Sequence, residues 1–446
     1  MKFLSSRVIL FLVPVVVWFF YSGLLIVNYN KLRTSPNNLN YFKDLALSFT
    51  QGKTNIECPP TTQCHDLVIY HGKNYLYWPP VPALVYIPFV LLFGRNTPDS
   101  LIITLFGALN VILIMCVAYK FASSYKIPIT NFLIACIGIF WGLGTVHFYM
   151  AMNPKVWFIS QVMAQTFLLG AVFVFLQKLN YKNLLLSGLF WGLACYTRND
   201  LVFSSVFFVV VYFTVHSNKF SVKSVLDGFA FAFFFIVFSI ANLGYNFIRF
   251  GSFTENGIQY HKMSAYYLES YKKHGFMSVY NIPYNFYVDI ISLPPFRAVV
   301  PFIGHNPEGF GFIWASPVFL IFIPWLFIYI LVVFFRAKGK PGLPLDKLEK
   351  NDLWVMGGLL VSTSLIAFVI LCIMGPGFSQ FAARYTLDFQ LFIILFMLFM
   401  FKVLPSNKIF NRTLIVLLAL SMYINYAGTI YFNQLVPKFQ TKNQLK

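Results

Sequence analysis

Ionisable and aromatic residues gather in the first long polar interval of the chain, between Asn37 and Pro82, and could form part of a chemical site. Asp66 begins the segment DLVIYHGKNYLYWPP, which predicts a short hairpin that turns at His71-Gly72 and stops at Pro79-Pro80. A carboxylate held at the start of such a hairpin could accept a proton from a hydroxyl group, as a general base does. Asp66 is therefore the first candidate catalytic residue, and an ordinary surface charge is the alternative.

Asp44 is the second candidate base, and it lies in residues 38–51, which predict an amphipathic helix. The apolar residues of this segment recur at the helical period and share one face: Leu39, Phe42, Leu45, Ala46 and Phe49. Gly52 follows at a position suited to a C-cap. We expect the apolar stripe to face lipid and Asp44 to point away from it, either into solvent or toward a reaction cavity.

Aromatic residues of the same interval could stack on sugar rings or anchor the loop at the membrane interface. They are Tyr70, Tyr75, Tyr77 and Trp78. Cys58 and Cys64 are a disulfide candidate if the loop faces an oxidising compartment, and two unpaired thiols are the alternative. Nearby histidines do not complete a zinc-ligand spacing. No metal site or cofactor is assigned, with a divalent metal ion left open.

The second long polar interval runs from Asn246 to about Gly311. Its segment YNFIRFGSFTENGIQYHK places Arg249 and Lys262 just beyond an apolar span, together with Glu255, Tyr260 and His261. Arg297, His305 and Glu308 come later in the interval. Cations at a membrane surface are well placed to hold a lipid-linked phosphate, and contact with ordinary lipid headgroups is the alternative.

Two short polar tips lie directly beside apolar spans. YTRND contains Arg198 and Asp200, and FAARYTLDF contains Arg384, Tyr385 and Asp388. Ionisable groups at membrane depth are costly and are usually paired or functional. Arg384 and Asp388 are four residues apart and would share a face of a helix, so a structural salt bridge competes with a role for Arg384 in phosphate binding.

The composition assigns most of the chain to a bilayer. Of 446 residues, 58% are hydrophobic and 11% are charged, whereas a soluble domain carries roughly 25% charged residues. Continuous apolar runs of about 20 residues fit membrane helices and not the alternating strands of a barrel. The formal net charge of +19 sits in short clusters between these runs, as topology signals do, so we expect no nucleic-acid partner.

The apolar runs predict an all-α polytopic membrane protein with about eleven transmembrane helices and two long extracytoplasmic loops. The predicted spans are 8–27, 101–119, 129–146, 156–176, 184–196, 201–215, 225–245, 312–335, 353–373, 389–401 and 414–431. Residues 82–94 are too short to cross and predict an interfacial or re-entrant segment. The first span is expected to be retained and not cleaved as a signal peptide.

Positive charge falls in every loop that this layout places inside, so we expect a multi-pass protein of the cell membrane with a cytoplasmic N-terminus. We divide the chain into an N-terminal transmembrane module (1–245) with a catalytic first outer loop (29–82), a second extracytoplasmic loop (246–311) and C-terminal transmembrane helices (312–446). Residues 339–344 are the expected hinge.

Five segments resemble the GT-C superfamily of membrane glycosyltransferases, near its protein O-mannosyltransferase and aminoarabinose-transferase branch. They are the first-loop helix with Gly52, then GKNYLYWPPVPALVYIP, GLACYTRND, YNFIRFGSFTENG and ARYTLDF, in that order along nearly the whole chain. Nucleotide-binding and hydrolase motifs such as the Walker loop, GxGxxG, GxSxG and HExxH are missing from the sequence, which agrees with a lipid-phosphate sugar donor.

The resemblance implies an inverting transferase that uses a polyprenyl-phosphate sugar, with an acidic base in the first loop and outer-surface Arg or Lys residues on the donor phosphate. Many relatives carry an acid where this chain has Asn37-Asn38, and Tyr77 falls where one branch has a second acid. The base would then be Asp66 or Asp44, and Asp66 ranks first because a hairpin should fix it better than a helix face.

The resulting hypothesis is transfer of a sugar to an extracytoplasmic glycan, lipid or protein. Donor phosphate would be bound by Arg384, Arg198, Arg249 and Lys262. Substrate contacts would come from Tyr75, Tyr77, Trp78, Glu255, Tyr260, His261, Tyr385 and Asp388. The alternatives are a transporter or flippase of lipid-linked sugars, which would favour ionisable groups at mid-span and inverted repeats, and a non-catalytic membrane scaffold.

Overall fold

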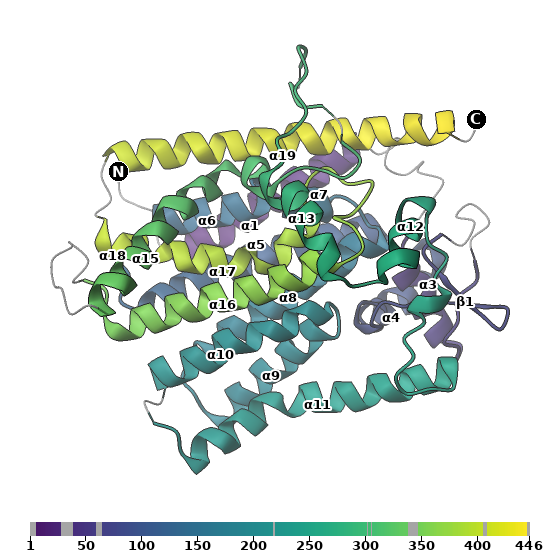
Figure 1. Ribbon diagram of the computed structural model, residues 1–446, viewed down its shortest axis with the longest axis horizontal. Coiled ribbons are helices and arrows are strands. Elements are labelled where there is room, and N and C mark those ends of the chain that lie inside the picture. The colour runs from purple at the N-terminus through teal and green to yellow at the C-terminus, as the bar shows by residue number, and fades with distance from the viewer. Residues whose placement is uncertain are drawn as a thin grey trace.

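A computed structural model describes residues 6–27, 39–58, 65–216, 219–300, 302–304, 306–337, 347–404 and 408–443. The described chain is mostly helical, and its one sheet is a two-stranded hairpin. The long helices form a bundle, with α11 (Val222–Phe250) along one edge and α19 (Lys408–Asn443) along the opposite edge (Figure 1).

Eight helical stretches of the described residues are long and apolar enough to cross a membrane. They comprise α1 (Ser6–Val27), α5 (Asp99–Ser124), α8 (Val156–Phe175), α11, η8 with α15 (Pro317–Ile321, Phe322–Ala337), α16 (Lys350–Cys372), η9 with α17 and α18 (Arg384–Thr386, Leu387–Leu398, Met400–Val403), and α19. The other three predicted crossings coincide with shorter helices: α6 (Asn131–Leu143), α9 (Tyr181–Cys195), and η3 with α10 and η4 (Asn199–Ser204, Ser205–Val211, Tyr212–His216). The chain is an all-α polytopic membrane protein, as predicted.

The centre of the bundle is α8, which packs against α5 on one side and α9 on the other. Helix α9 in turn packs against α11. At this second contact a Cβ added to Gly188 would lie 1.9 Å from the carbonyl oxygen of Phe231, so glycine is what lets the two backbones approach. On the other side of the bundle, α16 packs against α10 and α17.

Polar residues inside the bundle hydrogen-bond to one another. The Asn110 amide of α5 lies 3.2 Å from His147 Nε2 of α7 (Val146–Ala151) and donates to the Val162 carbonyl at 2.9 Å. Thr166 of α8 donates to the Asn110 side-chain oxygen at 2.6 Å. Burying these groups is favourable only because they are paired, so the network fixes the register of three helices.

The first polar loop forms α3 (Tyr41–Phe49), the strands β1 (Val68–Tyr70) and β2 (Lys73–Tyr75), α4 (Val81–Phe93) and the short turn η2 (Gly94–Asn96). The predicted hairpin is confirmed, since Val68 pairs with Tyr75 and the turn residues His71 and Gly72 both have positive φ. The segment predicted at residues 82–94 forms α4, a helix of 13 residues over Val81–Phe93 that begins after Pro80.

The amphipathic helix is confirmed in part, but its environment was predicted wrongly. Helix α3 is shorter than residues 38–51, with Asn40 as N-cap and Thr50 as C-cap. Its apolar stripe does not face lipid, because Phe42, Leu45 and Ala46 are fully buried and α3 packs against α4. Gly52 lies two residues beyond the C-cap and has φ of +70°.

The second polar loop contains η5 (Ile258–Tyr260), α12 (Ala265–His274), η6 (Val279–Asn281), α13 (Ile282–Phe286) and η7 (Tyr287–Ile291), and it ends at α14 (Phe312–Ala315). Because α11 continues to Phe250, a domain boundary at residue 245 would cut through a helix. The expected hinge at 339–344 lies outside the described residues. Figure 1 shows α12 at the same end of the bundle as α3, α4 and β1. The two polar loops meet there through a backbone bridge between Val68 and His261.

Candidate functional site

Asp66 is held in place by backbone contacts from two other segments. Its N–H donates to the Lys262 carbonyl at 3.3 Å, and the Lys262 N–H donates to the Leu67 carbonyl at 2.8 Å. The Tyr41 hydroxyl of α3 donates to the His65 carbonyl at 2.6 Å. Asp66 has φ of +60°, a left-handed conformation that costs a non-glycine residue on the order of 1 kcal/mol. Both polar loops therefore contribute to the fixed position of this carboxylate.

The Asp66 carboxylate faces two imidazole rings. Its Oδ1 lies 3.5 Å from His261 Nε2, and its Oδ2 lies 3.5 Å from His65 Nε2. The Asp66 side chain keeps 13% of its surface exposed, whereas the His261 side chain keeps 3%. Neither ring nitrogen of His261 has a hydrogen-bond partner within the described part of the chain. A carboxylate in this setting can accept a proton from a hydroxyl group brought beside it.

Tyr77 lies next to this carboxylate and within electrostatic range of Arg384. Its ring stacks on Trp78 at 3.8 Å and meets the His261 ring edge-on at 4.7 Å. Burial, and then the negative charge of Asp66, raise the pKa of Tyr77 well above its usual value, while Arg384 acts in the opposite direction. Tyr77 therefore remains a neutral phenol between a candidate base and a buried cation.

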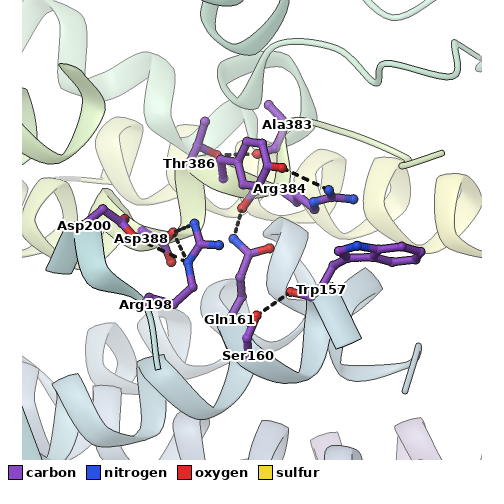
Figure 2. Close-up of polar contacts among 10 residues, drawn as sticks. Trp157, Ser160, Gln161, Arg198, Asp200, Ala383, Arg384, Thr386 and Asp388 are labelled. Carbon is purple, nitrogen blue, oxygen red and sulfur yellow. Dashed lines mark hydrogen bonds and ion pairs between the residues drawn. The ribbon is translucent and has the colours of Figure 1, made fainter. Parts of the chain in front are cut away.

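Arg384 is a buried cation with two unused donors, and 4% of the residue is exposed. Its Nη2 donates to the Tyr385 hydroxyl at 3.2 Å, but Nε and Nη1 have no partner in the described chain. The guanidinium lies 5.8 Å from the ring centre of Trp157 (Figure 2). It lies 5.5 Å from the ring centre of Phe158. An anion that reached this arginine would find two N–H groups ready to donate.

The backbone of Arg384 is anchored from the centre of the bundle. The Gln161 amide of α8 donates to the Arg384 carbonyl at 2.9 Å (Figure 2). Arg384 opens the 3₁₀ turn η9, which leads into the buried helix α17. The cation is thus held by the two most deeply buried of the eight long apolar stretches, which lowers the cost of ordering it around a ligand.

Lys155 is a second cation at this place, and the sequence analysis did not identify it. It precedes α8, and burial followed by the charge of Arg384 lowers the pKa of Lys155 to about 8. Within the described ranges no ion pair reaches either Lys155 or Arg384. Two neighbouring cations without a carboxylate partner favour binding of an anion such as a phosphate.

Two further polar groups, Tyr267 and Asp289, lie within range of Arg384 and were also missed. The pKa of Tyr267 is raised, mainly by burial. Electrostatic interactions with Tyr385, Arg384, Asp66 and Glu308 also act on this pKa. Asp289 of η7 is fully buried, and burial raises its pKa well above the usual value in spite of Arg384. Tyr77 and Tyr267 each interact electrostatically with both Asp66 and Arg384. The structure therefore brings residues from both polar loops and from η9 into one neighbourhood.

Asp388 pairs with Arg198, so the alternative of a salt bridge between Asp388 and Arg384 does not hold. Its Oδ2 accepts from Arg198 Nη2 at 2.5 Å and from Nε at 3.0 Å, and Asp200 lies 3.5 Å from the same arginine (Figure 2). The Asp388 side chain is fully buried. The ion pair between Arg198 and Asp388 thus joins η3 to α17. This argues against a role for Arg198 in phosphate binding and for Asp388 in substrate binding.

Arg249 is also engaged inside the protein. Its Nη1 donates to the Leu76 carbonyl at 2.6 Å, its Nη2 donates to Asn246 at 2.7 Å, and its guanidinium lies 3.9 Å from the ring centre of Tyr245. These contacts tie the end of α11 to the residues before Pro79-Pro80. Arg249 therefore supports the loop that carries Tyr77, and its donors are not available to a phosphate in this arrangement.

Asp44 belongs to a different group of charges. The Lys43 ammonium pairs with Asp99 at 2.8 Å, and the exposed Arg95 pairs with Glu57 at 3.2 Å. These are the charges that act on Asp44, and in the described chain no contact joins it to Asp66 or Arg384. The structure therefore does not bring the two candidate bases together.

Burial raises the pKa of Asp44 to about 6, which predicts a pH-dependent stability. The folded state then binds a proton more tightly than the unfolded state, so stability falls as pH rises from about 4 to 6. We expect Asp44→Asn to raise the free energy of unfolding by about 1–2 kcal/mol at pH 7 and by much less at pH 4. Thermal unfolding across this range measures the difference, with the exposed Glu57→Gln as control. Equal stabilisation at both pH values would contradict the prediction.

Several predicted substrate-binding residues take packing or loop-holding positions. Tyr75 packs edge-on against Phe250 at 5.4 Å in a small buried cluster with Val68. Glu255 accepts from the Gly257 N–H at 2.5 Å and from the Gln259 amide, which closes its own turn. Tyr260 packs on Tyr70 at 4.8 Å. Lys262 is exposed beside Asp66, while Tyr77, Trp78, His261 and Tyr385 lie around the candidate site.

The disulfide prediction is tested only at one end. Cys58 is disulfide-bonded, whereas Cys64 lies outside the described residues, so their pairing stays a prediction. Cys116, Cys136, Cys195 and Cys372 are free. In the ranges that the structure describes, no group of three His, Cys, Asp or Glu side chains could hold a metal ion.

Comparisons with known proteins give one structural similarity. No protein-family model and no curated protein matches this chain. Among solved structures the chain is similar to the S. cerevisiae protein O-mannosyltransferase complex bound to the sugar donor, with a TM-score of 0.38 and 16% sequence identity. The similarity covers 66% of this chain and 39% of the yeast chain.

Proposed function

We propose that this chain is an inverting membrane glycosyltransferase. It would move a sugar from a polyprenyl-phosphate donor to a hydroxyl group of an extracytoplasmic acceptor. The observation that carries the proposal is that a candidate general base and a buried cation lie in one neighbourhood. Asp66, a carboxylate flanked by histidines, and Arg384, a cation without a carboxylate partner, both act on the buried tyrosines Tyr77 and Tyr267. Lys155 lies within electrostatic range of Arg384.

The reaction divides naturally between these groups. Asp66 accepts the proton of the acceptor hydroxyl while the hydroxyl oxygen attacks the anomeric carbon of the donor sugar. The bond between that carbon and the phosphate oxygen breaks, and the polyprenyl phosphate leaves with the electron pair. A single displacement of this kind inverts the anomeric configuration. Arg384 and Lys155 stabilise the negative charge that develops on the departing phosphate.

The surroundings of Arg384 suit this role. Charge-assisted hydrogen bonds to a phosphate are stronger in a site with little water, and the aromatic rings of Trp157, Phe158 and Tyr385 surround the guanidinium. The cation has lost its hydration without gaining a carboxylate, so a ligand phosphate would recover the lost interactions. Arg198 and Arg249 do not share this feature, since their donors are already used.

The proposal is tested by comparing cells with the gene, without it, and with an Asp66→Asn copy. Mass spectrometry of envelope glycans and extracted lipids is the measurement. We expect one glycosyl unit to disappear from an envelope glycan, lipid or protein, and a polyprenyl-phosphate sugar to accumulate, in both the deletion and the variant. Unchanged glycans and lipids would overturn the proposal. Restoration by the Asp66→Asn copy would exclude Asp66 as the base, and restoration by an Asp44→Asn copy as well would indicate transport or scaffolding instead of transfer.

A further inference from the structure

Glu308, in the second polar loop, is a carboxylate held by two phenols outside the proposed catalytic group. The Tyr266 hydroxyl of α12 donates to Oε1, and the Tyr284 hydroxyl of α13 donates to Oε2 at 2.6 Å. No ion pair reaches this carboxylate from the described residues. An ionised carboxylate can accept about four hydrogen bonds, so each oxygen keeps room for another donor.

The backbone around Glu308 is fixed by hydrogen bonds from the buried side chain of Gln380. The Gln380 amide donates to the Glu308 carbonyl at 2.7 Å and to the Pro376 carbonyl at 3.0 Å, and Gln380 is fully buried. The Glu308 N–H donates to the Asn306 side chain at 3.1 Å. The carboxylate is therefore preorganised, which reduces the entropy that a ligand must remove on binding.

Aromatic rings beside this carboxylate are open to solvent. Tyr266 is 37% exposed, Phe378 is 40% exposed and Tyr284 is 52% exposed. The rings of Tyr266 and Phe378 lie 4.6 Å apart with an angle of 31° between their planes. A Cβ added to Gly375 would lie 2.8 Å from the Tyr267 ring and 3.6 Å from the Tyr266 ring, so glycine lets these tyrosines pack over the 375–380 segment.

The two phenols keep their protons at neutral pH. Burial and the bond to Glu308 raise the pKa of Tyr284 to about 12, and the pKa of Tyr266 rises for the same reasons. Each phenol oxygen can therefore donate to Glu308 and still accept a bond from a ligand. Anchoring at a membrane interface, the common role of exposed tyrosines, requires neither the shared carboxylate nor the buried amide beneath it.

This group borders the proposed reaction centre. Tyr267 follows Tyr266 on α12 and lies within electrostatic range of Glu308, Asp66 and Arg384. A molecule whose reacting hydroxyl lies beside Asp66 could therefore extend across Tyr267 to Glu308. Tyr266, which binds Glu308, and Tyr267, on which Asp66 acts, are consecutive residues of α12.

We propose that Glu308, Tyr266, Tyr284 and Phe378 form a subsite for a sugar ring of a glycan acceptor, remote from the hydroxyl that is glycosylated. The inference rests on the proposed function, and it names the acceptor as a glycan. Exposed rings stack on the apolar face of a pyranose, and the carboxylate with its two phenols accepts hydrogen bonds from neighbouring hydroxyls. An organic cation is the competing ligand, because carboxylates and aromatic faces also attract ammonium groups.

The test measures binding without catalysis. Full-length Asp66→Asn protein in lipid nanodiscs is titrated with maltohexaose, cellohexaose, mannohexaose and chitohexaose, and separately with choline, by saturation-transfer NMR. We expect at least one hexasaccharide to bind, and Glu308→Gln or Tyr284→Phe to weaken that binding by about tenfold. Tyr287→Phe is the matched control, because this exposed tyrosine of η7 has no bond to Glu308, and it should leave binding unchanged.

Three results would overturn the proposed subsite. It is rejected if no hexasaccharide binds, if binding is the same in both variants, or if the variants weaken choline binding alone. Tyr284→Phe removes one oxygen atom and keeps the test valid if Glu308→Gln does not fold. Binding here is independent of turnover, so a wild-type protein that binds the hexasaccharide without any transferase activity would overturn the proposed function and leave the subsite intact.

Discussion

Asp66→Asn is expected to reduce glycosyl transfer by about 10²–10⁴-fold, the range that a positioned general base contributes. Asparagine matches the size of aspartate, and it adopts the left-handed backbone region more readily than most residues. The turn at φ of +60° should therefore survive, together with the backbone bonds to Lys262. What the variant loses is the ability to accept a proton.

The measurement is transfer from polyprenyl-phosphate sugar extracted from the source cells, with thermal unfolding recorded in parallel. Glu57→Gln is a suitable control, since it neutralises an exposed carboxylate of the same loop that pairs with the exposed Arg95. Full activity in a folded Asp66→Asn protein would exclude Asp66 as the base. Loss of activity in Asp44→Asn alone would move the base to the separate charge group of α3.

Arg384→Gln is expected to weaken binding of the donor by about 100-fold, with a smaller effect on binding of the acceptor. Glutamine keeps part of the side-chain volume, but its shorter neutral amide removes the positive charge and with it the charge-assisted bonds that Nε and Nη1 would donate. Hydrogen bonds to a charged group contribute about 1.5–3 kcal/mol each, so the loss of two such bonds gives at least this effect. Lys155→Met should weaken donor binding in the same direction.

Titration with a polyprenyl phosphate and with the matching polyprenol separates the contribution of the phosphate to binding from that of the polyprenyl chain. The variant should lose affinity for the phosphate and retain affinity for the alcohol. Arg95→Gln, which changes an exposed arginine of the first loop, is the control. Equal loss for both lipids would mean that Arg384 affects binding of the polyprenyl chain and not of the phosphate. An unchanged affinity for the phosphate would remove Arg384 from the phosphate site.

Hydropathy and turn chemistry determined the elements of this protein from the sequence alone. Membrane helices need long apolar runs because their backbone must satisfy its own hydrogen bonds in lipid, so each of the eleven predicted crossings coincides with a helix. The β1–β2 hairpin was equally local, since His71-Gly72 supplies the positive φ values of its turn. Asp66, at the start of that hairpin, could be singled out for the same reason.

Tertiary structure decided which charges meet. Arg384 and Asp388 are spaced as helix neighbours, but Arg384 lies in the 3₁₀ turn η9 before α17 begins, and Asp388 pairs with Arg198 across the bundle. The periodicity of α3 revealed its apolar face, but it could not distinguish a protein neighbour from lipid, since both are apolar.

Lys155 and Asp289 are two residues whose place beside Arg384 could not be predicted from the sequence. Each is an isolated charge in an apolar stretch of sequence, and nothing in its neighbours along the chain predicts a place beside Arg384. Periodicity and composition are properties of a few consecutive residues. Contacts between residues more than 90 apart depend on how the helices pack, and only the packed bundle brings these charges within range of one another.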